Sequence, residues 1–490
     1  MKTTLKKMLC LLLAIVFVFS LTACGGGDTE STIDLGGDEG WDIETDGSTD
    51  ADNTGDSSDA ANTSDATQTT SSSNKKPTGV QGVTVKDADK LSWSELVAQM
   101  PSSLRGTTIT IYSWNDAKDV TGSEKVMSDF TKQTGIKVKW LKGNYETYDS
   151  EIAAKINSGD SPDVIRYIQP LVSRMSLTQD VKTATGYDFK GDIWDKNLTD
   201  AYTIKGKIYG VNLKNTFNQQ PTIVAYSKNT INRYKLDDPY ELWKNGEWTM
   251  DNFIDICKAF TEETQRPAWM TCNQLDVLWF SGVSMITFDG KEYKNNLSDK
   301  KVLDALKKCA YYRTDGIVPA ATRENDKLEN GTYLFYTDNI IGHRRTDYHF
   351  STLKSNDDLY CVPFPTGLTD TYYQAYNEYE AYGIPKGAKN PEAVYYFLRY
   401  YLDANNYDRN MFFCNNQALE VFEWCRSQKN VQYNIYRGLT KTVGNENAGL
   451  ETYLNRVGNE AQLQAEIDKT AIPLVNQAVK QANETLAKFK

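Results

Sequence analysis

Beyond residue 105 the chain alternates between short apolar runs rich in β-branched residues and longer segments whose apolar residues recur every three or four positions. The short runs predict buried strands, and the longer segments predict helices with one buried face. Val126 and Phe130 show the helical spacing, and Gly135 follows where such a helix would end. The first five predicted elements are a strand at 108–112, a helix at 123–133, a strand at 136–140, a helix at 145–157 and a strand at 163–167.

This strand–helix alternation predicts an α/β fold with a parallel sheet and right-handed crossovers. Ligands of open parallel sheets bind outside the carboxyl ends of the strands. Two such ends are legible, and each places an aromatic residue beside amide or carboxylate groups. The candidate binding residues at these ends are Trp114, Asn115, Asp116, Tyr167 and Gln169.

Three further helices are predicted outside this region. Residues 90–104 are expected to form a short prefix helix that packs on the domain. Asn390 and Pro391 have the order of an N-cap and a first helical residue. Pro473 opens the last helix. The core-facing stripes of the last two helices are Val394, Phe397, Leu398 and Tyr401, and then Val475, Ala478, Val479, Ala482 and Leu486.

The amino terminus has the layout of a secretory signal. Three lysines precede an apolar run of about 14 residues, which is short against the ~20 that a membrane-spanning helix needs. The run ends at Leu21-Thr22-Ala23-Cys24, followed by glycines, which resembles the lipobox of bacterial lipoproteins. The resemblance implies a signal peptide at 1–23 and a lipid anchor on Cys24. The alternative is an ordinary secretory signal with a chance cysteine.

Residues 24–77 are expected to form a disordered tether. They are rich in Ser, Thr, Asp and Gly, and 13 acidic residues stand against two lysines. Such a segment has too little apolar surface to offset the entropy of ordering. As a flexible coil it would span roughly 40 Å. A calcium loop is the alternative for the Asp-rich run, but the register of acidic residues around a glycine that such a loop needs is missing.

The acidic tether accounts for most of the net charge of −11, which leaves the rest of the chain close to neutral. Without a basic excess, nucleic acid is not expected as a partner. The six cysteines after the lipobox show no C-x-x-C pair and no nearby histidine, so a metal site is not expected. We also expect no cofactor. The even number of these cysteines permits disulfides in an exported protein, and buried thiols are the alternative. They are Cys257, Cys272, Cys309, Cys361, Cys414 and Cys425.

Six segments, in order and spacing, resemble the extracellular solute-binding proteins of ABC importers, in their large sugar-binding family. The opening strand ends in Tyr112-Ser113-Trp114, and a helix-to-strand segment contains Gly159-Asp160-Ser161-Pro162-Asp163. The segments are 109–114, 156–165, 205–212, 226–228, 248–253 and 383–393.

The resemblance implies a periplasmic-binding-protein-like fold, in which two α/β lobes enclose a ligand cleft. The implied function is capture of a sugar or oligosaccharide by cleft closure and delivery to ABC transporter permease subunits, at the outer face of the bacterial cytoplasmic membrane. We expect a monomer. The expected crossings between lobes lie near 211–218, 375–382 and 425–432. The expected parts are a prefix region at 78–104, lobe 1 at 105–213 and 379–428, and lobe 2 at 214–378 and 429–490.

Aromatic residues are abundant, with 10 Trp, 30 Tyr and 17 Phe. Sugar rings stack their C–H faces on aromatic rings, while their hydroxyls need polar partners. Trp279, Tyr336 and Asp338 lie in segments similar to cleft segments of the family, and Tyr379 lies just before the return to lobe 1. A packed core position is the alternative for each aromatic. The candidates are Trp114, Tyr167, Trp279, Tyr336 and Tyr379 for stacking, and Asn115, Asp116, Gln169 and Asp338 for polar contacts.

Enzymatic motifs are sparse. The two histidines, His343 and His349, are six residues apart, which does not fit an H-E-x-x-H metal site. The sequence has no G-x-S-x-G motif and no P-loop. A glycoside hydrolase needs only two carboxylates, so this alternative stays open beside an adhesive cell-surface protein. We expect a binding protein without catalytic residues.

Overall fold

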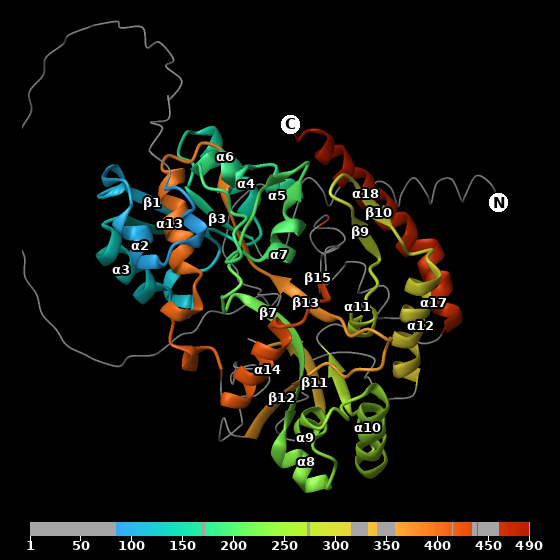
Figure 1. Cartoon of the computed structure of the whole chain (residues 1–490). Coiled ribbons are helices and arrows are strands. Elements are labelled where there is room, and N and C mark those ends of the chain that lie inside the picture. Colours follow the sequence, from blue (N-terminus) through green and yellow to red (C-terminus); the bar gives the residue numbers. More distant parts are fainter. Residues whose placement is uncertain are drawn as a thin grey trace, which may run out of the picture. The chain divides into compact units, whose positions relative to one another are not determined.

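The computed structural model describes residues 85–167, 172–271, 275–314, 332–340, 358–413, 415–433, 439 and 460–489. Figure 1 traces their helices and strands. All of these residues belong to one compact unit, 69–490. Of the residues that the sequence singles out, Cys24, Gln169, His343, His349, Cys272 and Cys414 lie outside the described residues.

The first sheet has the strand order β2-β1-β3-β14-β4. β1 pairs in parallel with β2 and β3, whereas β14 is antiparallel to both β3 and β4. We call this sheet and the helices around it lobe 1. Its strands are β1 (Thr108–Ser113), β2 (Lys137–Lys142), β3 (Val164–Tyr167), β4 (Thr178–Gln179) and β14 (Ala381–Pro385).

The helices of lobe 1 confirm the predicted βαβαβ order. One helix lies between β1 and β2 in the chain, and another between β2 and β3. Gly135 ends the first of them at a φ of 76°, a conformation that glycine adopts without strain. The helices are α2 (Trp93–Ala98), α3 (Ser123–Thr134), α4 (Tyr148–Asn157), α5 (Val172–Met175), α6 (Val181–Thr185), α7 (Lys196–Ala201) and α13 (Pro391–Tyr401).

The predicted stripe of α13 is buried, and the helix packs against α3 and α6 (Figure 1). Asn390, however, does not cap it, because its side-chain amide donates to the Thr108 carbonyl at 3.0 Å instead. The prefix helix is also shorter than expected. α2 is held by a capping box between Ser92 and Glu95, and short 3₁₀ helices at Ala88–Lys90 and Ser102–Leu104 flank it.

The second sheet has the order β15-β13-β7-β11-β8, with β12 also paired to β7. β7 lies at its centre and is antiparallel to β11, β12 and β13. This sheet and its helices form lobe 2. The strands are β7 (Gln219–Ser227), β8 (Trp269–Thr271), β11 (Phe335–Asn339), β12 (Leu359–Pro363), β13 (Gln374–Tyr379) and β15 (Val431–Tyr433).

The helices of lobe 2 are α8 (Lys228–Tyr234), α9 (Pro239–Lys244), α10 (Met250–Thr264), α11 (Asp276–Phe280), α12 (Lys300–Thr314) and α14 (Asn416–Arg426). Two short antiparallel pairs complete the described strands: β5 (Thr203–Ile204) with β6 (Lys207–Ile208), and β9 (Ile286–Phe288) with β10 (Tyr293–Asn295).

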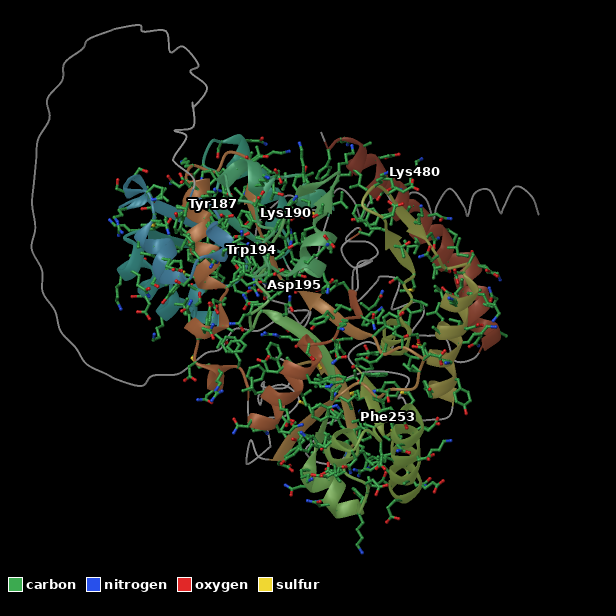
Figure 2. The ribbon with its side chains drawn as sticks, in the orientation of Figure 1. Tyr187, Lys190, Trp194, Asp195, Phe253 and Lys480 are labelled. Atoms are coloured by element: carbon green, nitrogen blue, oxygen red, sulfur yellow. The ribbon has the colours of Figure 1, made fainter. Side chains whose placement is uncertain are left out.

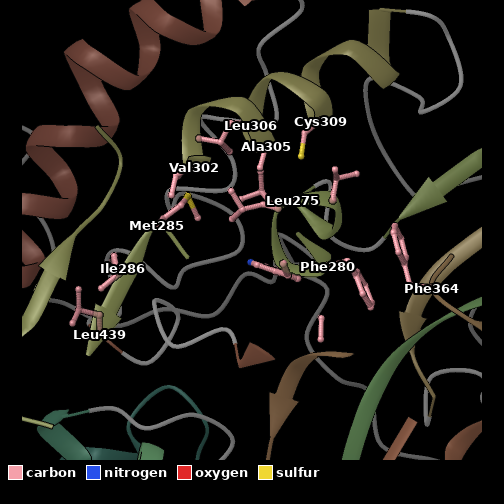
Figure 3. Packing of buried hydrophobic residues seen from close by; sticks show 14 of the residues in the cluster. Leu275, Phe280, Met285, Ile286, Val302, Ala305, Leu306, Cys309, Phe364 and Leu439 are labelled. Carbon is pink, nitrogen blue, oxygen red and sulfur yellow. The ribbon is translucent and has the colours of Figure 1, made fainter. Parts of the chain in front are cut away.

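Close aromatic packing fills the core of lobe 2. Phe280 of α11 stacks on Phe364 with ring centroids 4.0 Å apart, and Leu275, Met285 and Leu306 lie in the same buried cluster (Figure 3). In lobe 1 the corresponding role falls to Tyr187, Trp194 and Tyr395, and Figure 2 labels the first two. Each sheet therefore packs against a dense aromatic core, and a half-exposed aromatic residue elsewhere differs from this packing.

Two chain segments run side by side between the sheets. Val211 and Tyr382 exchange backbone hydrogen bonds of 3.0 and 2.9 Å, and Gln219 then pairs with Tyr379 as β7 begins. The third passage differs from the expected crossing near 425–432. α14 already packs against β12, where the Asn415 side chain donates to the Leu359 carbonyl at 2.9 Å. The chain therefore leaves lobe 1 between α13 and α14, and the expected lobe 1 boundary at 428 is too late.

The carboxy-terminal helices are α17 (Glu460–Glu466) and α18 (Ile472–Ala487), joined by a π-helical turn at Ile467–Ala471. The predicted stripe on α18 is buried except for Val479, which is partly buried. α18 packs against β10 of lobe 2 and α5 of lobe 1, and the Lys205 ammonium donates to the Phe489 carbonyl at 2.7 Å. Among the described helices, none has the length and apolar character that crossing a membrane requires.

Candidate functional site

The site is built at the carboxyl end of β1. After Ser113 the chain turns through Trp114 and Asn115, and the Asp116 carboxylate accepts a hydrogen bond from the Ala117 amide at 2.8 Å. The Trp140 indole donates to the Asn115 carbonyl at 2.9 Å. These two bonds fix the backbone at Asn115 and directly after it, so the turn presents its side chains from a defined position.

Trp114 is half-buried in a group of aromatic and cationic side chains. Tyr148 meets it edge-on, with ring centroids 5.2 Å apart and planes at 84°. Tyr145 does the same at 6.0 Å and 78°. The guanidinium carbon of Arg166 lies 4.8 Å from the Trp114 centroid, which is within the range of a cation–π interaction. Trp114 is therefore held in place by neighbours from β3 and from the segment after β2.

Arg166 connects this group to the passage between the sheets. Its guanidinium forms an ion pair with Glu380, the residue between β13 and β14, and donates to the Asn115 side-chain oxygen at 3.2 Å. The Glu380 carboxylate also accepts from the Tyr382 hydroxyl at 3.3 Å. Burial disfavours the charged form of Arg166, but the Glu380 carboxylate overcomes this and raises the pKa of Arg166 above its usual value. Arg166 is therefore charged at every physiological pH.

The structure brings two of the five strand-end candidates together at Arg166, namely Trp114 and Asn115. Asp116 is half-buried beside them and caps a 3₁₀ turn. Tyr167 is different, because its ring is completely buried and its hydroxyl bonds to Thr178 at 3.0 Å. The expectation that Tyr167 contacts ligand is therefore not supported, and we assign it to the core. Alternate residues of a strand point to opposite faces, which explains why Arg166 and Tyr167 differ.

The second-lobe candidates are spread over three elements. Trp279 in α11 and Tyr336 in β11 are buried, with 2% and 1% of their surfaces exposed. Asp338, also in β11, is half-buried and accepts from the Asn339 amide at 2.7 Å. Tyr379 lies in β13 and pairs with Gln219 through the backbone. The described ring contacts of Trp114 involve Tyr145, Tyr148 and Arg166, and none of these lobe 2 candidates.

Sequence reasoning missed Arg166, Glu380 and Tyr145. One signal was available for the first: Arg166 interrupts an otherwise apolar strand, and a buried charge needs a partner. Glu380 is 214 positions away, so the pairing itself was out of reach. The sequence predicts a helix from residue 145, but α4 begins at Tyr148 and leaves Tyr145 in the preceding loop.

Neither a metal nor a reactive thiol has support in the described part of the chain. The described residues contain no group of three His, Cys, Asp or Glu side chains placed to hold a metal ion. Cys257 and Cys425 are buried free thiols, and burial raises the pKa of each above its usual value. Both are therefore protonated and inert near neutral pH.

A family model described as bacterial extracellular solute-binding protein matches residues 125–411, more than half of the chain. The chain belongs to this family. The matched region contains β2, β3 and β14 of lobe 1 and most of the second sheet. No curated protein matches the chain.

Solved structures share the fold at low sequence identity. The galacto-N-biose/lacto-N-biose I-binding protein of an ABC transporter from Bifidobacterium longum has a TM-score of 0.57 at 14% identity, over 76% of this chain and 98% of that one. The sugar-binding protein MalE from Xanthomonas citri has a TM-score of 0.53 at 14% identity, over 78% and 98%. An ABC substrate-binding protein from Listeria monocytogenes, solved with cycloalternan, has a TM-score of 0.51 at 16% identity, over 78% and 100%.

These similarities establish the two-lobe fold of extracellular binding proteins for this chain. The lobes defined by the two sheets correspond to that architecture, which confirms the fold expected from the sequence.

Proposed function

We propose that the protein captures a sugar or oligosaccharide outside the cytoplasm and delivers it to the permease of an ABC transporter. The observation that carries the proposal is the group of Trp114, Asn115, Asp116 and Arg166 at the carboxyl end of the first sheet, in a chain of the solute-binding family. The similar structures from Bifidobacterium longum and Xanthomonas citri are sugar-binding proteins, which supports a carbohydrate ligand.

In this proposal Trp114 offers a ring for stacking, and Asn115 and Asp116 offer polar groups to sugar hydroxyls. The Asn115 side-chain oxygen already accepts from Arg166, so its amide nitrogen is the part that faces a ligand hydroxyl. Asp338 and Tyr379 are the lobe 2 groups we propose to complete the site when the lobes close, and Gln169 stays a candidate from the segment after β3. A ligand that touches both lobes favours the closed state.

We further propose that lipid on Cys24 anchors the mature protein, that residues 25–77 form the tether, and that the protein acts as a monomer without catalysis. Cys24→Ser should abolish incorporation of labelled fatty acid and release the protein from membranes. If the native protein incorporates no fatty acid, the anchor is refuted.

A thermal-shift screen against mono- and oligosaccharides tests the sugar assignment. A ligand at about 100 times its Kd should stabilise the protein by ~2.7 kcal/mol, which a melting curve detects readily. Product analysis of the same mixtures should find the sugar unchanged.

The affinity test is Trp114→Ala, which should weaken binding by about tenfold or more. Trp93→Ala is the matched control, because Trp93 is also a partly buried indole of lobe 1 but packs on Tyr400, away from this site. Equal losses in both variants, or binding of a peptide or polyamine and of no sugar, would overturn the assignment.

A further inference from the structure

We propose that Tyr145 is a second stacking residue of this site and that it selects ligands of at least two linked sugar rings. The inference rests on the proposed function, since it presumes that Trp114 stacks on a sugar. It adds a residue and a minimum ligand length to that function.

Tyr145 stands beside Trp114 because their strands are paired. β1 and β2 run in parallel with Ser113 opposite Lys142, so the chain leaves both strands at the same edge of the sheet. Trp114 is the first residue after β1, and Tyr145 follows β2 by three residues. The 6.0 Å between their ring centroids is a consequence of this register.

Tyr145 is 61% exposed, and among the described residues only Tyr311 and Met411 are also exposed large hydrophobics. A single exposed aromatic needs no explanation on its own. Here the exposed ring lies beside Trp114, the stacking candidate, at the same edge of the sheet. Covering an aromatic surface in that place makes the binding free energy more favourable.

The loop that carries Tyr145 is held on both sides. The Gly143 amide donates to the Ser113 carbonyl at 2.7 Å, and a Cβ at Gly143 would meet the Tyr112 hydroxyl at 2.5 Å, so only glycine allows this approach. The Glu146 amide donates to the Asn144 side chain at 2.8 Å. The Thr147 hydroxyl donates to Glu151 at 2.6 Å.

A fixed backbone under an exposed ring means that little conformational entropy is lost when a ligand binds there. The loop is therefore prepared for contact with a ligand before the ligand arrives.

The angle between the rings points to more than one sugar. The Trp114 and Tyr145 planes meet at 78°, so one pyranose ring with its face stacked on Trp114 cannot also lie face-on against Tyr145. A second ring, turned at the glycosidic bond, can lie against the Tyr145 face. Arg166 and Tyr148 both contact the Trp114 ring and hold it in place, which keeps the angle between the Trp114 and Tyr145 rings constant.

The test is a length series on the full chain by titration calorimetry. The probes are maltose, lactose, cellobiose and xylobiose, the monosaccharides that compose them, and the corresponding trisaccharides. Tyr145→Ala should raise the Kd of di- and trisaccharides by about tenfold and that of the monosaccharide by less than about twofold. Tyr145→Phe should keep wild-type affinity, because stacking needs the ring and not the hydroxyl. Tyr311→Ala is the matched control, since Tyr311 is also an exposed tyrosine, at 55%, but lies on α12.

Two results would overturn the role of Tyr145 while leaving the proposed function intact. One is a Tyr145→Ala variant that binds every length as the wild type does, and the other is an equal loss for mono- and disaccharides. A wild-type protein that binds none of the probes would instead overturn the proposed function, and the Tyr145 inference with it.

Discussion

The guanidinium of Arg166 lies 4.8 Å from the ring centroid of Trp114 and is at the same time paired with Glu380. One cation thus contacts both the proposed sugar-stacking ring and the residue where β13 of lobe 2 passes into β14 of lobe 1. Movement of the lobes takes place at such connecting residues. The ion pair therefore links the proposed ligand surface directly to the passage between the lobes.

Loss of this cation should be costly. Arg166→Met leaves the Glu380 carboxylate buried without a cation, with the Tyr382 hydroxyl still donating to it, and we expect the free energy of unfolding to fall by about 3–5 kcal/mol in urea titrations. The double variant Arg166→Met with Glu380→Gln should recover much of that loss, because no charge then remains buried. If Arg166→Met lowers the free energy of unfolding by less than about 1 kcal/mol, the Arg166–Glu380 ion pair is solvated. The proposed link between Trp114 and the passage between the lobes would then be wrong.

Substitution of Trp279 should mainly lower stability, whereas substitution of Trp114 should mainly lower sugar affinity. Trp279 has 2% of its surface exposed and lies in the large buried cluster, so Trp279→Ala should lower the free energy of unfolding by about 3–5 kcal/mol. Trp114→Ala, in a half-buried position, should cost clearly less stability but more sugar affinity. Urea titration and calorimetry on both variants distinguish them. If the Trp279→Ala protein is as stable as the wild type but binds sugar much more weakly, Trp279 contacts the ligand after all.

The prefix should be an integral part of lobe 1. The Asp89 carboxylate accepts hydrogen bonds from the Trp194 indole at 2.9 Å, the Tyr395 hydroxyl at 2.6 Å and the Gly191 amide at 2.8 Å. Asp89→Ala leaves these donors without their acceptor and should cost about 2–3 kcal/mol of unfolding free energy. Asp87→Asn is the control, since it removes an exposed ion pair with Lys90 that is worth under about 1 kcal/mol, and asparagine tolerates the left-handed φ of 52° at this position. Equal effects of the two substitutions would mean that the prefix is not clamped.

Glu151 should make the Tyr145 loop sensitive to acid. Hydrogen bonds from Thr147 and Tyr112 lower the pKa of Glu151 below its usual value. The carboxylate is thus favoured in the folded state. Its contribution to stability is present above the usual glutamate pKa, about 4.3, and is lost as pH falls through the lowered folded value.

Urea midpoints should therefore fall between about pH 5 and pH 3, and Glu151→Gln should remove part of that fall. Glu124→Gln, at an exposed position of α3, controls for the loss of one negative charge. A pH profile that Glu151→Gln leaves unchanged would show that these hydrogen bonds add no stability.

Sequence periodicity was sufficient for the parallel part of lobe 1. β1, α3, β2, α4 and β3 follow residues whose spacing reports burial directly, and Gly135 marks a helix end by its backbone alone. The same reasoning placed Trp114 and Asn115 at a strand end, because the rule that it used concerns parallel sheets in general. These parts were predictable because local sequence determines them.

Other features depend on contacts between distant residues. The apolar stripe of α14 shows that the helix covers a sheet but not which sheet, so the third passage was misplaced. Tyr167 and Arg166 are neighbours in one strand, and only the paired Glu380 shows which of the two faces a polar site. The Tyr145 contact with Trp114 likewise depends on the register between β1 and β2.

The central claim is that two lobes close on a sugar, and small-angle scattering of the purified protein with and without its best-binding oligosaccharide tests it most directly. We expect the radius of gyration to decrease on addition of the sugar, and Trp114→Ala to require a correspondingly higher sugar concentration for the same decrease. A saturating sugar that leaves the radius of gyration of the wild-type protein unchanged would contradict capture by closure.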